Sequence, residues 1–353
     1  MAAFGAGEYA SDWVGEAVVR RLLFWLGVAL SALFLYLALR GLKLDEFWRD
    51  LGQTNLLWLV PAIAIYFLSI VVRAWRWGYM LRPFKEIGLG RMYATVCIGY
   101  MGNNIYPARI GEVVRAYTLQ RSEGVPIATS LATVFMERLM DGIVMVGFVL
   151  FALPSVPSIN ATVRSILTLA SAVFVIGAIV FFALALAPKL AEQIAGAIVR
   201  KVLPARLQGL VMGFVQKFVA GAQCLRHPSD LLILFLSTVV IWLMETVKYW
   251  LIWHGFSANA GYRELPFIAF MLFNGVANLS TIIPSGPGYI GTYEAAGVAV
   301  FGALGIGQGL AVAYTLVMHI ALWLPVTLLG GFFMLREGLR WTDFRTAQTV
   351  AGK

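Results

Sequence analysis

The stretch that decides the fold runs from Asn103 to Arg115 and reads NNIYPARIGEVVR. It lies between apolar runs, yet it carries two amides, a proline and three charged side chains. Polar groups at membrane depth are costly and usually functional. A second stretch from Asn278 to Glu294, NLSTIIPSGPGYIGTYE, repeats the order of amide, proline, glycine and glutamate. We interpret the two stretches as broken helices that face each other and form one site.

Composition places the chain among polytopic membrane proteins. Of its 353 residues, 60% are hydrophobic and 13% are charged, and the mean hydropathy is +0.81, far from the usage of soluble domains. The net charge of +9 comes from short basic clusters beside apolar runs, where such residues set topology and meet anionic headgroups. We therefore exclude nucleic acid as a partner. Cys97 and Cys224 are far apart, which predicts neither a disulfide framework nor a thiolate metal site.

Apolar runs of about 20 residues predict six full crossings, because that length spans about 30 Å of hydrocarbon. The expected spans are 22–39, 56–72, 126–153, 165–187, 231–253 and 309–335. Five basic residues follow the second span against one glutamate, and this excess predicts a cytoplasmic loop; they are Arg73, Arg76, Arg82, Lys85 and Arg91. We expect both termini in the cytoplasm and the protein in a bacterial-type inner (plasma) membrane.

Two shorter elements do not fit this scheme of full crossings. Proline and glycine interrupt residues 92–122 and 266–304, which predicts re-entrant or broken helices covered by protein or by a wet cavity. Interrupted segments at matching positions of two halves mark the binding sites of transporters, so an inverted repeat is our hypothesis. We expect a single domain over 1–353, with a first half at 22–187, a basic amphipathic segment on the cytoplasmic surface at 188–230, and a second half at 231–335.

A charged triplet lies in the middle of the third expected span. Glu137 and Asp141 are four residues apart and share a helix face, and Arg138 is three residues from Asp141. Three charges at mid-span need partners or water. One interpretation is a structural ion-pair cluster. The other is that Arg138, with Arg109 and Arg115, neutralises a lipid phosphate, because a guanidinium binds phosphate bidentately and stays charged.

The first break also admits two interpretations. Asn103, Asn104 and Pro107 either end a helix and cap its free backbone groups, or they aim the amino terminus of a half-helix at an anionic headgroup. In the second case Gly111 allows close approach of the backbone.

The second break is rich in turn-forming residues. Pro284, Gly288 and Gly291 have the composition of a tight turn that leads into a helix. A turn alone is one interpretation. Glu294 follows on an otherwise apolar helix, which favours a place for its carboxylate in the same polar cavity as the first break.

Enzyme signatures such as GxSxG, HExxH, a P-loop or spaced histidine ligands do not occur in the sequence. We therefore expect no enzymatic activity, no metal and no cofactor. Asp45 and Glu46 are the candidates for a membrane glycosyltransferase, although a solvated loop explains them better. Glu245 with Lys248 is expected to be a structural pair, and His319 a buried histidine with satisfied hydrogen bonds.

Three blocks of the sequence resemble those of a known family. They are Asn104 to Arg115, the run MERLMD from Met136 to Asp141, and PSGPG from Pro284 with its continuation to Glu294. Together they resemble the signature of the lysylphosphatidylglycerol synthase transmembrane-region family, also described as flippase-like membrane proteins, over nearly the whole chain. The resemblance implies a domain that translocates lipids. Members of this family are associated with several lipids, including polyprenyl-linked glycans and hopanoids, so the resemblance does not select one.

In two-domain members of this family, a soluble aminoacyl-transferase domain follows the membrane part. The sequence to Lys353 contains no such domain, so we do not carry over the synthesis of lysyl-lipid.

We therefore expect an all-α polytopic protein that moves an anionic or headgroup-modified lipid between leaflets through a central polar cavity. Without an ATP-binding motif, transport is expected to be downhill or coupled to an ion gradient. Membrane lipids are the expected partners. The residues expected to bind the headgroup or to shape the cavity are Asn104, Arg109, Glu112, Arg115, Glu137, Arg138, Asp141 and Glu294. Two alternatives stay open: a membrane enzyme or subunit in polyprenyl-linked glycan or other lipid biosynthesis, and a non-transporting scaffold for lipid-synthesis enzymes.

Overall fold

The fold is built from helices alone in the part of the chain that can be described. The computed structural model describes residues 25–106, 109–155, 187–202, 227–257, 264–283 and 285–340, with scattered positions between 165 and 213. Within these ranges every regular element is a helix, which confirms the predicted all-α fold. A helix closes its backbone hydrogen bonds within the segment, as a chain in lipid requires.

Several helices are long and apolar enough to cross a membrane. They are Leu56–Leu81, Ser229–Phe256 and Gln308–Arg336, with a fourth span if Trp25–Leu39 and α2 (Leu44–Gly52), which are bent by 85°, count as one. These helices confirm a polytopic membrane protein, and they match four of the six predicted spans. The fifth, α6 (Ile127–Ala152), has the length of a span but carries the charged triplet in its middle. Most of the sixth, 165–187, lies outside the described residues.

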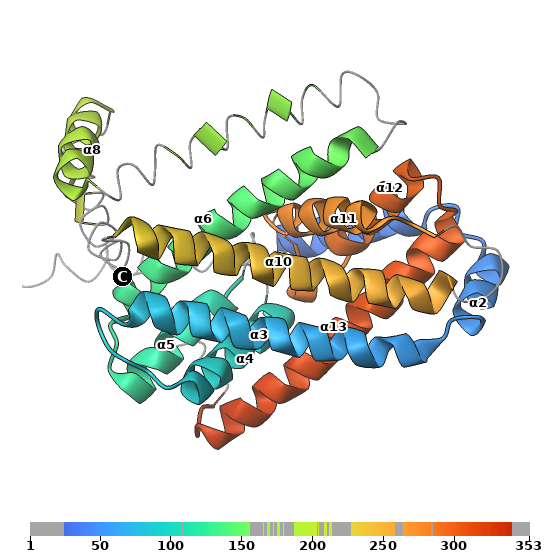
Figure 1. Ribbon diagram of the computed structural model, residues 1–353, viewed down its shortest axis with the longest axis horizontal. Helices are drawn as coiled ribbons and strands as arrows, with labels where there is room; N and C mark the ends of the chain where they lie inside the picture. The colour runs from blue at the N-terminus through green and yellow to red at the C-terminus, as the bar shows by residue number, and fades with distance from the viewer. Residues whose placement is uncertain are drawn as a thin grey trace, which may run out of the picture.

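The long helices form one bundle. In Figure 1, α3 (Leu59–Leu81) and α10 (Pro228–Ser257) pack side by side along the long axis of the molecule. Behind them, α13 (Gln308–Arg336) crosses at an angle and packs on α4 (Leu89–Ile105). The core is aromatic on the α10 side, where the ring of Trp253 stacks on Phe301 with centroids 5.6 Å apart.

Both predicted broken elements are present. The first consists of α4 and α5 (Gly111–Glu123), and the second of α11 (Phe267–Ser280), the 3-10 turn η4 (Pro287–Tyr289) and α12 (Thr292–Ala303). Their outer bounds agree with the predicted 92–122 and 266–304 to within three residues. The η4 turn packs on α4, so the two breaks meet inside the bundle. Pro107 and Pro284, which were expected to cause the breaks, lie outside the described residues.

The remaining elements lie at the ends of the bundle. The 3-10 turns η1 (Leu56–Trp58) and η2 (Leu153–Ser155) flank α3 and α6, and α8 (Pro188–Val202) lies apart from the other helices in Figure 1. On α8, basic residues and the exposed side chains of Leu190, Ile194 and Ile198 occur together, and the amphipathic surface segment stays a prediction. Most of the rest of 188–230 lies outside the described residues.

The prediction of a cytoplasmic loop directly after Val72 is wrong for its first two arginines. Helix α3 continues to Leu81, so Arg73 and Arg76 lie inside it, and their side chains are buried. The physical reason is that carboxylates on other helices neutralise them, which the rule of basic flanking loops does not consider.

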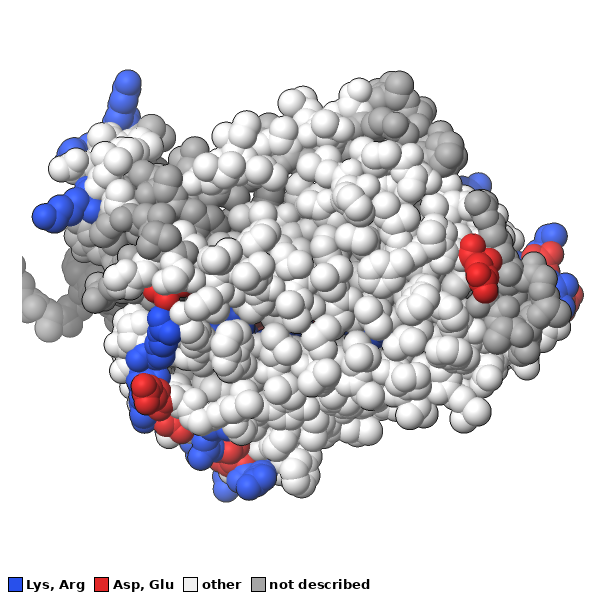
Figure 2. All heavy atoms as spheres, viewed as in Figure 1, with Lys and Arg blue, Asp and Glu red and all other residues white. Residues whose placement is uncertain are grey.

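On the face of the bundle that Figure 2 shows, the charged side chains lie near the two ends. In Figure 2, the face in view is almost free of Lys, Arg, Asp and Glu along its middle. Apolar side chains of the long helices are exposed, including Leu68 of α3, Val240 of α10 and Leu328 of α13. An uncharged middle between charged ends is what a bilayer requires of a face that it covers.

A glycine contact holds the two halves of the first broken element together. A Cβ atom on Gly111 would lie 2.6 Å from the backbone nitrogen of Asn103, and one on Gly102 would lie 2.8 Å from the Cα atom of Gly111. Distances under about 3 Å cannot be accommodated without movement of the backbone. Gly111 therefore allows close approach of α4 to α5. Its expected role in the close approach of a ligand stays a prediction.

We predict that Gly111→Ala lowers the free energy of unfolding by about 1–3 kcal/mol, the usual cost of overpacking a tight contact. Gly90→Ala is the matched control, because nothing lies within 4 Å of a Cβ atom at Gly90, and it is expected to change stability by less than about 1 kcal/mol. Denaturant unfolding in detergent micelles measures both. Equal stability of the two variants would contradict the glycine contact.

Candidate functional site: a charged cavity between the broken helices

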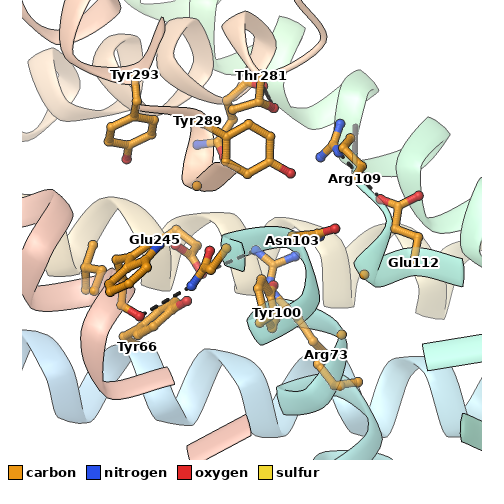
Figure 3. A pocket seen from close by; sticks show the side chains of 18 of the residues that line it. Tyr66, Arg73, Tyr100, Asn103, Arg109, Glu112, Glu245, Thr281, Tyr289 and Tyr293 are labelled. Atoms are coloured by element: carbon orange, nitrogen blue, oxygen red, sulfur yellow. Dashed lines mark hydrogen bonds and ion pairs between the residues drawn. The ribbon is translucent and has the colours of Figure 1, made fainter. Parts of the chain in front are cut away.

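A cavity that is partly open to the exterior lies between the two broken elements. Its lining comes from α3, α4, α5, α6, α10, α11, η4, α12 and α13. Figure 3 shows Tyr289 and Tyr293 on the side of the cavity opposite Tyr66 and Tyr100. Both predicted stretches therefore contribute to one site.

The most deeply buried part of the charged network is an ion-pair bridge between α3 and α6. Arg76 donates hydrogen bonds to Asp141 Oδ1 (2.9 Å) and Glu137 Oε1 (3.3 Å). On the other oxygen of Glu137, Arg115 of α5 donates over 2.6 Å. The indole N–H of Trp242 also donates to Asp141, over 3.0 Å. The Arg76 side chain is only 1% exposed, so this bridge is fully removed from solvent.

The network continues toward the break between α4 and α5. Arg138 Nη1 lies 3.1 Å from Asp141 Oδ2, and its Nε lies 3.3 Å from Glu112 Oε1. The same oxygen of Glu112 lies 3.6 Å from Arg109 Nε. Arg138 and Arg109 are partly exposed, so they form the accessible end of the network.

On the α10 side, Glu245 holds two further cations. Arg73 Nη2 lies 3.3 Å from Glu245 Oε1, and Lys248 forms an ion pair with the other oxygen of Glu245. The Arg73 guanidinium also lies 4.6 Å from the ring centroid of Trp242, a cation–π geometry. Glu245 and Lys248 were predicted to be a structural pair, and they do pair. They also line the cavity.

The cavity carries an excess of positive charge. Six cations line it among the described residues, namely Arg73, Arg76, Arg109, Arg115, Arg138 and Lys248. Their carboxylate partners are Glu112, Glu137, Glu245 and Asp141. The six cations share four carboxylates, so these ten groups carry a net charge of about +2. In addition, the Nε–H groups of Arg73, Arg76 and Arg115 have no hydrogen-bond partner among the described residues.

The second broken element contributes a histidine–glutamate pair. His319 of α13 contacts the Glu294 carboxylate through Nδ1 and the Gly288 carbonyl through Nε2, at 2.9 Å. The second oxygen of Glu294 accepts from the Gly291 N–H over 2.6 Å. Gly288 and Gly291 both have positive φ, at 66° and 91°, so the turn predicted from their composition is present and needs glycine at these positions.

The two breaks approach each other through a pair of non-glycine residues with positive φ. These are Arg109 (φ 56°) and Tyr289 (φ 61°), and the guanidinium of the first lies 5.9 Å from the ring centroid of the second. Such backbone conformations are rare outside glycine and tend to occur at functional sites. Figure 3 shows the two side chains next to each other.

The structure brings most of the predicted site residues together. The lining includes Asn104, Arg109, Gly111, Glu112, Arg115, Glu137, Arg138 and Gly288. Asp141 and Glu294 do not line the cavity but pair with Arg138 and His319, which do. Asn104 donates to Thr327 Oγ1 (2.8 Å) and the Trp323 carbonyl (3.3 Å), so it also ties α4 to α13. Whether any of them binds a ligand stays a prediction.

Sequence reasoning did not assign Arg73, Arg76, Glu245, Lys248 or His319 to this site. Arg73 with Arg76, and Glu245 with Lys248, are spaced by three residues and therefore share a helix face. Two charges on one face of an apolar helix are the signal that would have identified these four positions. His319 stands alone on its helix and offered no such signal.

We predict that Arg76→Met lowers the free energy of unfolding by about 3–5 kcal/mol, because it leaves two buried carboxylates without their shared partner. Lys43→Met is the control. Lys43 pairs with Glu46 on the surface, with side chains 75% and 41% exposed, so this change is expected to cost less than about 1 kcal/mol. Denaturant unfolding in micelles compares them, and similar small losses in both variants would show that the bridge is unimportant for stability.

Comparison with known proteins agrees with this picture. "Glycosyltransferase AglD" of Haloferax volcanii is 25% identical over 90% of this chain, which spans 55% of that protein. An UPF0104 membrane protein of Pyrococcus horikoshii is 26% identical over 94% of this chain and 97% of its own length. A second UPF0104 membrane protein, from Methanothermobacter thermautotrophicus, is 25% identical over 78% of this chain and 83% of its own length. No solved structure matches the chain.

The sequence profile described as "Lysylphosphatidylglycerol synthase TM region" matches residues 24–330. This range contains both broken elements and every residue of the charged network. The match and the relatives agree with a membrane protein in lipid or glycan biosynthesis. The chain belongs to the lysylphosphatidylglycerol synthase transmembrane-region family.

Proposed function

We propose that the protein translocates an anionic lipid headgroup between leaflets through the charged cavity. The observation that carries the proposal is the excess of two positive charges in a cavity inside a membrane protein. Arginine suits this task because its planar guanidinium binds a phosphate bidentately and stays charged. The carboxylates hold the arginines apart and neutralise most of their charge while no headgroup is bound.

In this proposal the acyl chains stay in the bilayer while the headgroup enters the cavity. The segment around η4 is suited to separate the headgroup in the cavity from the acyl chains in the bilayer. Thr281 and Tyr289 line the cavity, while the neighbouring side chains of Ile282, Ile283 and Ile290 are 68%, 39% and 47% exposed. A segment that presents polar groups inward and isoleucines outward fits the boundary between a headgroup and its lipid tails.

Alternating access then requires the two broken elements to move relative to each other. Arg109 and Tyr289 are the contact between the breaks, and each has a backbone conformation that is unfavourable for its residue type. We propose that this contact closes the cavity on one side and separates when the headgroup passes. Broken helices that surround a site at mid-membrane are typical of transporters that work in this way.

We also propose an orientation in the membrane. At the end of the bundle where α3 and α13 finish, basic side chains are frequent, including Arg82, Lys85 and Arg336. At the opposite end, Lys43 and Arg49 pair with Glu46 and Asp50 at α2. An excess of basic residues marks the cytoplasmic side. We therefore place the end of the bundle where α3 and α13 finish on the cytoplasmic side of the inner membrane of a bacterial-type cell.

An enzymatic role in glycan biosynthesis is the alternative, suggested by the name of one relative, "Glycosyltransferase AglD". The sequence candidates for that role were Asp45 and Glu46. Both lie on α2, Glu46 pairs with the exposed Lys43, and neither lines the cavity. Translocation makes use of the charged cavity, whereas the enzymatic role at α2 leaves it without a purpose. We therefore favour translocation.

Leaflet exchange in vesicles tests the proposal. Purified protein is reconstituted without ATP or an ion gradient, and the exchange of fluorescent phosphatidylglycerol is followed by chemical quenching of the outer leaflet. We expect exchange faster than in protein-free vesicles. Arg138→Gln is expected to slow it about 10–100-fold, the value of a charge-assisted hydrogen bond of about 1.5–3 kcal/mol. Asp141, the partner of Arg138, keeps its contact with Arg76, so the variant is expected to fold.

Arg82→Gln is the matched control, because Arg82 is 45% exposed, pairs with Asp230 and does not line the cavity. It is expected to exchange lipid at the wild-type rate. Circular dichroism and size-exclusion chromatography establish that all proteins are folded. Folded wild-type protein that moves no anionic lipid faster than empty vesicles do would refute translocation and favour an enzymatic or scaffolding role.

A further inference from the structure

A histidine–glutamate pair borders the cavity, and the proposed translocation does not use it. His319 of α13 lines the cavity with a side chain that is 15% exposed, whereas the Glu294 side chain of α12 is 5% exposed and does not line it. Water in the cavity can therefore reach the imidazole ring, while the carboxylate behind it is shielded. Histidine is the side chain that ordinarily changes its charge near neutral pH, so the pair is a candidate site for a proton.

The contacts of this pair require a proton that can be lost. Nδ1 of His319 contacts a carboxylate oxygen of Glu294, and Nε2 lies 2.9 Å from the carbonyl oxygen of Gly288. A neutral imidazole has one N–H and an ionised carboxylate has none, so together they satisfy only one of the two contacts. One additional proton between Nδ1 and the carboxylate satisfies both. This proton belongs to the pair as a whole, and the pair that holds it has no net charge.

The charge of the pair determines how it acts on an anionic ligand. Among the described residues no lysine or arginine forms an ion pair with Glu294, so the proton is the group that neutralises this carboxylate. Without the proton, the pair carries one negative charge at the border of the cavity, and this charge repels an anionic headgroup. Binding of the proton removes the repulsion. The proton and the headgroup therefore each favour the binding of the other, as linkage requires.

The same pair is connected to the contact between the two breaks. Gly288, whose carbonyl oxygen faces Nε2 of His319, and Tyr289 both belong to the turn η4. The ring centroid of Tyr289 lies 5.9 Å from the guanidinium of Arg109 (Figure 3). Loss of the proton leaves His319 with one N–H, so its ring releases either Gly288 or Glu294. Release of either one loosens the attachment of the second broken element to α13.

The titratable groups closest to the ring in the described part of the chain have partners of their own. The ring centroid of Tyr293 on α12 lies 5.2 Å from that of His319, and the hydroxyl groups of Tyr293 and Tyr249 share a hydrogen bond of 2.6 Å. On α13 itself, Tyr314 donates to the Tyr249 carbonyl oxygen over 2.8 Å. These tyrosines therefore pack around the pair without replacing either of its members.

The helices α2, α3, α4 and α10, which also pack on α13, supply no second ionised partner for the ring among the described residues. The further titratable or charged side chains that they place on the cavity lining are Tyr66, Arg73 and Arg76 of α3, Tyr100 of α4, and Glu245 and Lys248 of α10. None of these six forms a hydrogen bond or an ion pair with His319. On α2, Asp50 lies beside Gly309, about 15 Å along α13 from His319.

We propose that the pair of His319 and Glu294 binds a coupling proton, so that one proton crosses the membrane with each anionic headgroup and in the same direction. This inference rests on the proposed function, because it assigns a coupling ion to the same cavity. The proton enters the pair from the side on which the cavity is open, and it leaves when the cavity has opened to the other side. A headgroup with one negative charge and its proton together carry no net charge, so the membrane potential does not oppose their movement.

A proton gradient across the vesicle membrane tests the coupling. Fluorescent phosphatidylglycerol is followed while the two sides differ by one pH unit, with valinomycin and equal potassium on both sides to prevent a voltage. We expect the lipid to accumulate in the leaflet on the more alkaline side, up to about tenfold, the limit for one proton per lipid. The direction does not depend on how the protein is inserted, because the lipid follows the protons. His319→Gln is expected to exchange the lipid without this accumulation.

His254→Gln is the matched control. His254 lies on α10, its Nδ1 is 2.8 Å from the Trp250 carbonyl oxygen, and it does not line the cavity. This variant is therefore expected to accumulate the lipid as the wild type does. Protein-free vesicles with the same gradient measure the passive redistribution of the lipid.

A second measurement observes the proton without transport. The chain contains three histidines, so His227→Gln combined with His254→Gln leaves His319 as the only one. Nuclear magnetic resonance of ¹⁵N-labelled histidine then reports the protonation of its ring nitrogens. We expect their signals to change between about pH 6 and pH 9, as the pair loses its proton. Signals that stay unchanged over this range would overturn the proposal, also in the case that His319→Gln does not fold.

The outcomes separate the two proposals. Exchange of phosphatidylglycerol by folded wild-type protein that a pH difference does not bias would overturn proton coupling and leave anion translocation standing. Equal accumulation by the wild type and His319→Gln would also overturn the inference, because the coupling proton would then bind elsewhere. A lack of exchange by folded protein, with and without a gradient, would refute translocation itself and the coupling with it.

Discussion

The arrangement of the site depends on one buried bridge, in which Arg76 of α3 holds both Glu137 and Asp141 of α6. At membrane depth neither carboxylate is tolerated without a cation, and the cation is not tolerated without them. The same two carboxylates then receive Arg115 from α5 and Arg138 from α6. The charged network of the cavity is therefore an extension of the contact that places α3 against α6.

Local sequence was sufficient to predict the two broken elements, because asparagine, proline and glycine interrupt apolar runs at these places. Helical spacing was sufficient for the triplet from Glu137 to Asp141, since charges three or four residues apart share a face. Membership of a polytopic all-α class followed from composition. The broken elements and the triplet have in common that each is encoded in one short, contiguous stretch of sequence.

The partners of the charges were not predictable in the same way. Arg76 and Glu137 are 61 residues apart, and Arg73 and Glu245 are 172 residues apart. Without those partners, arginines after an apolar run are expected to lie outside the membrane, and α3 was accordingly predicted to end before Arg73. The pairing of His319 with Glu294 was missed for the same reason, because the histidine has no charged neighbour on its own helix.

The glycine contact between α4 and α5 has an electrical consequence. Because Gly102 and Gly111 leave no space between the two helices, Arg109, Glu112 and Arg115 are carried on one rigid piece of the chain. That piece bears one net positive charge from these three residues. Any displacement of it along the membrane normal is therefore coupled to the transmembrane voltage, which acts on a unit charge with up to about 2.3 kcal/mol per 100 mV. The tight packing contact thus means that these charges cannot move without α4.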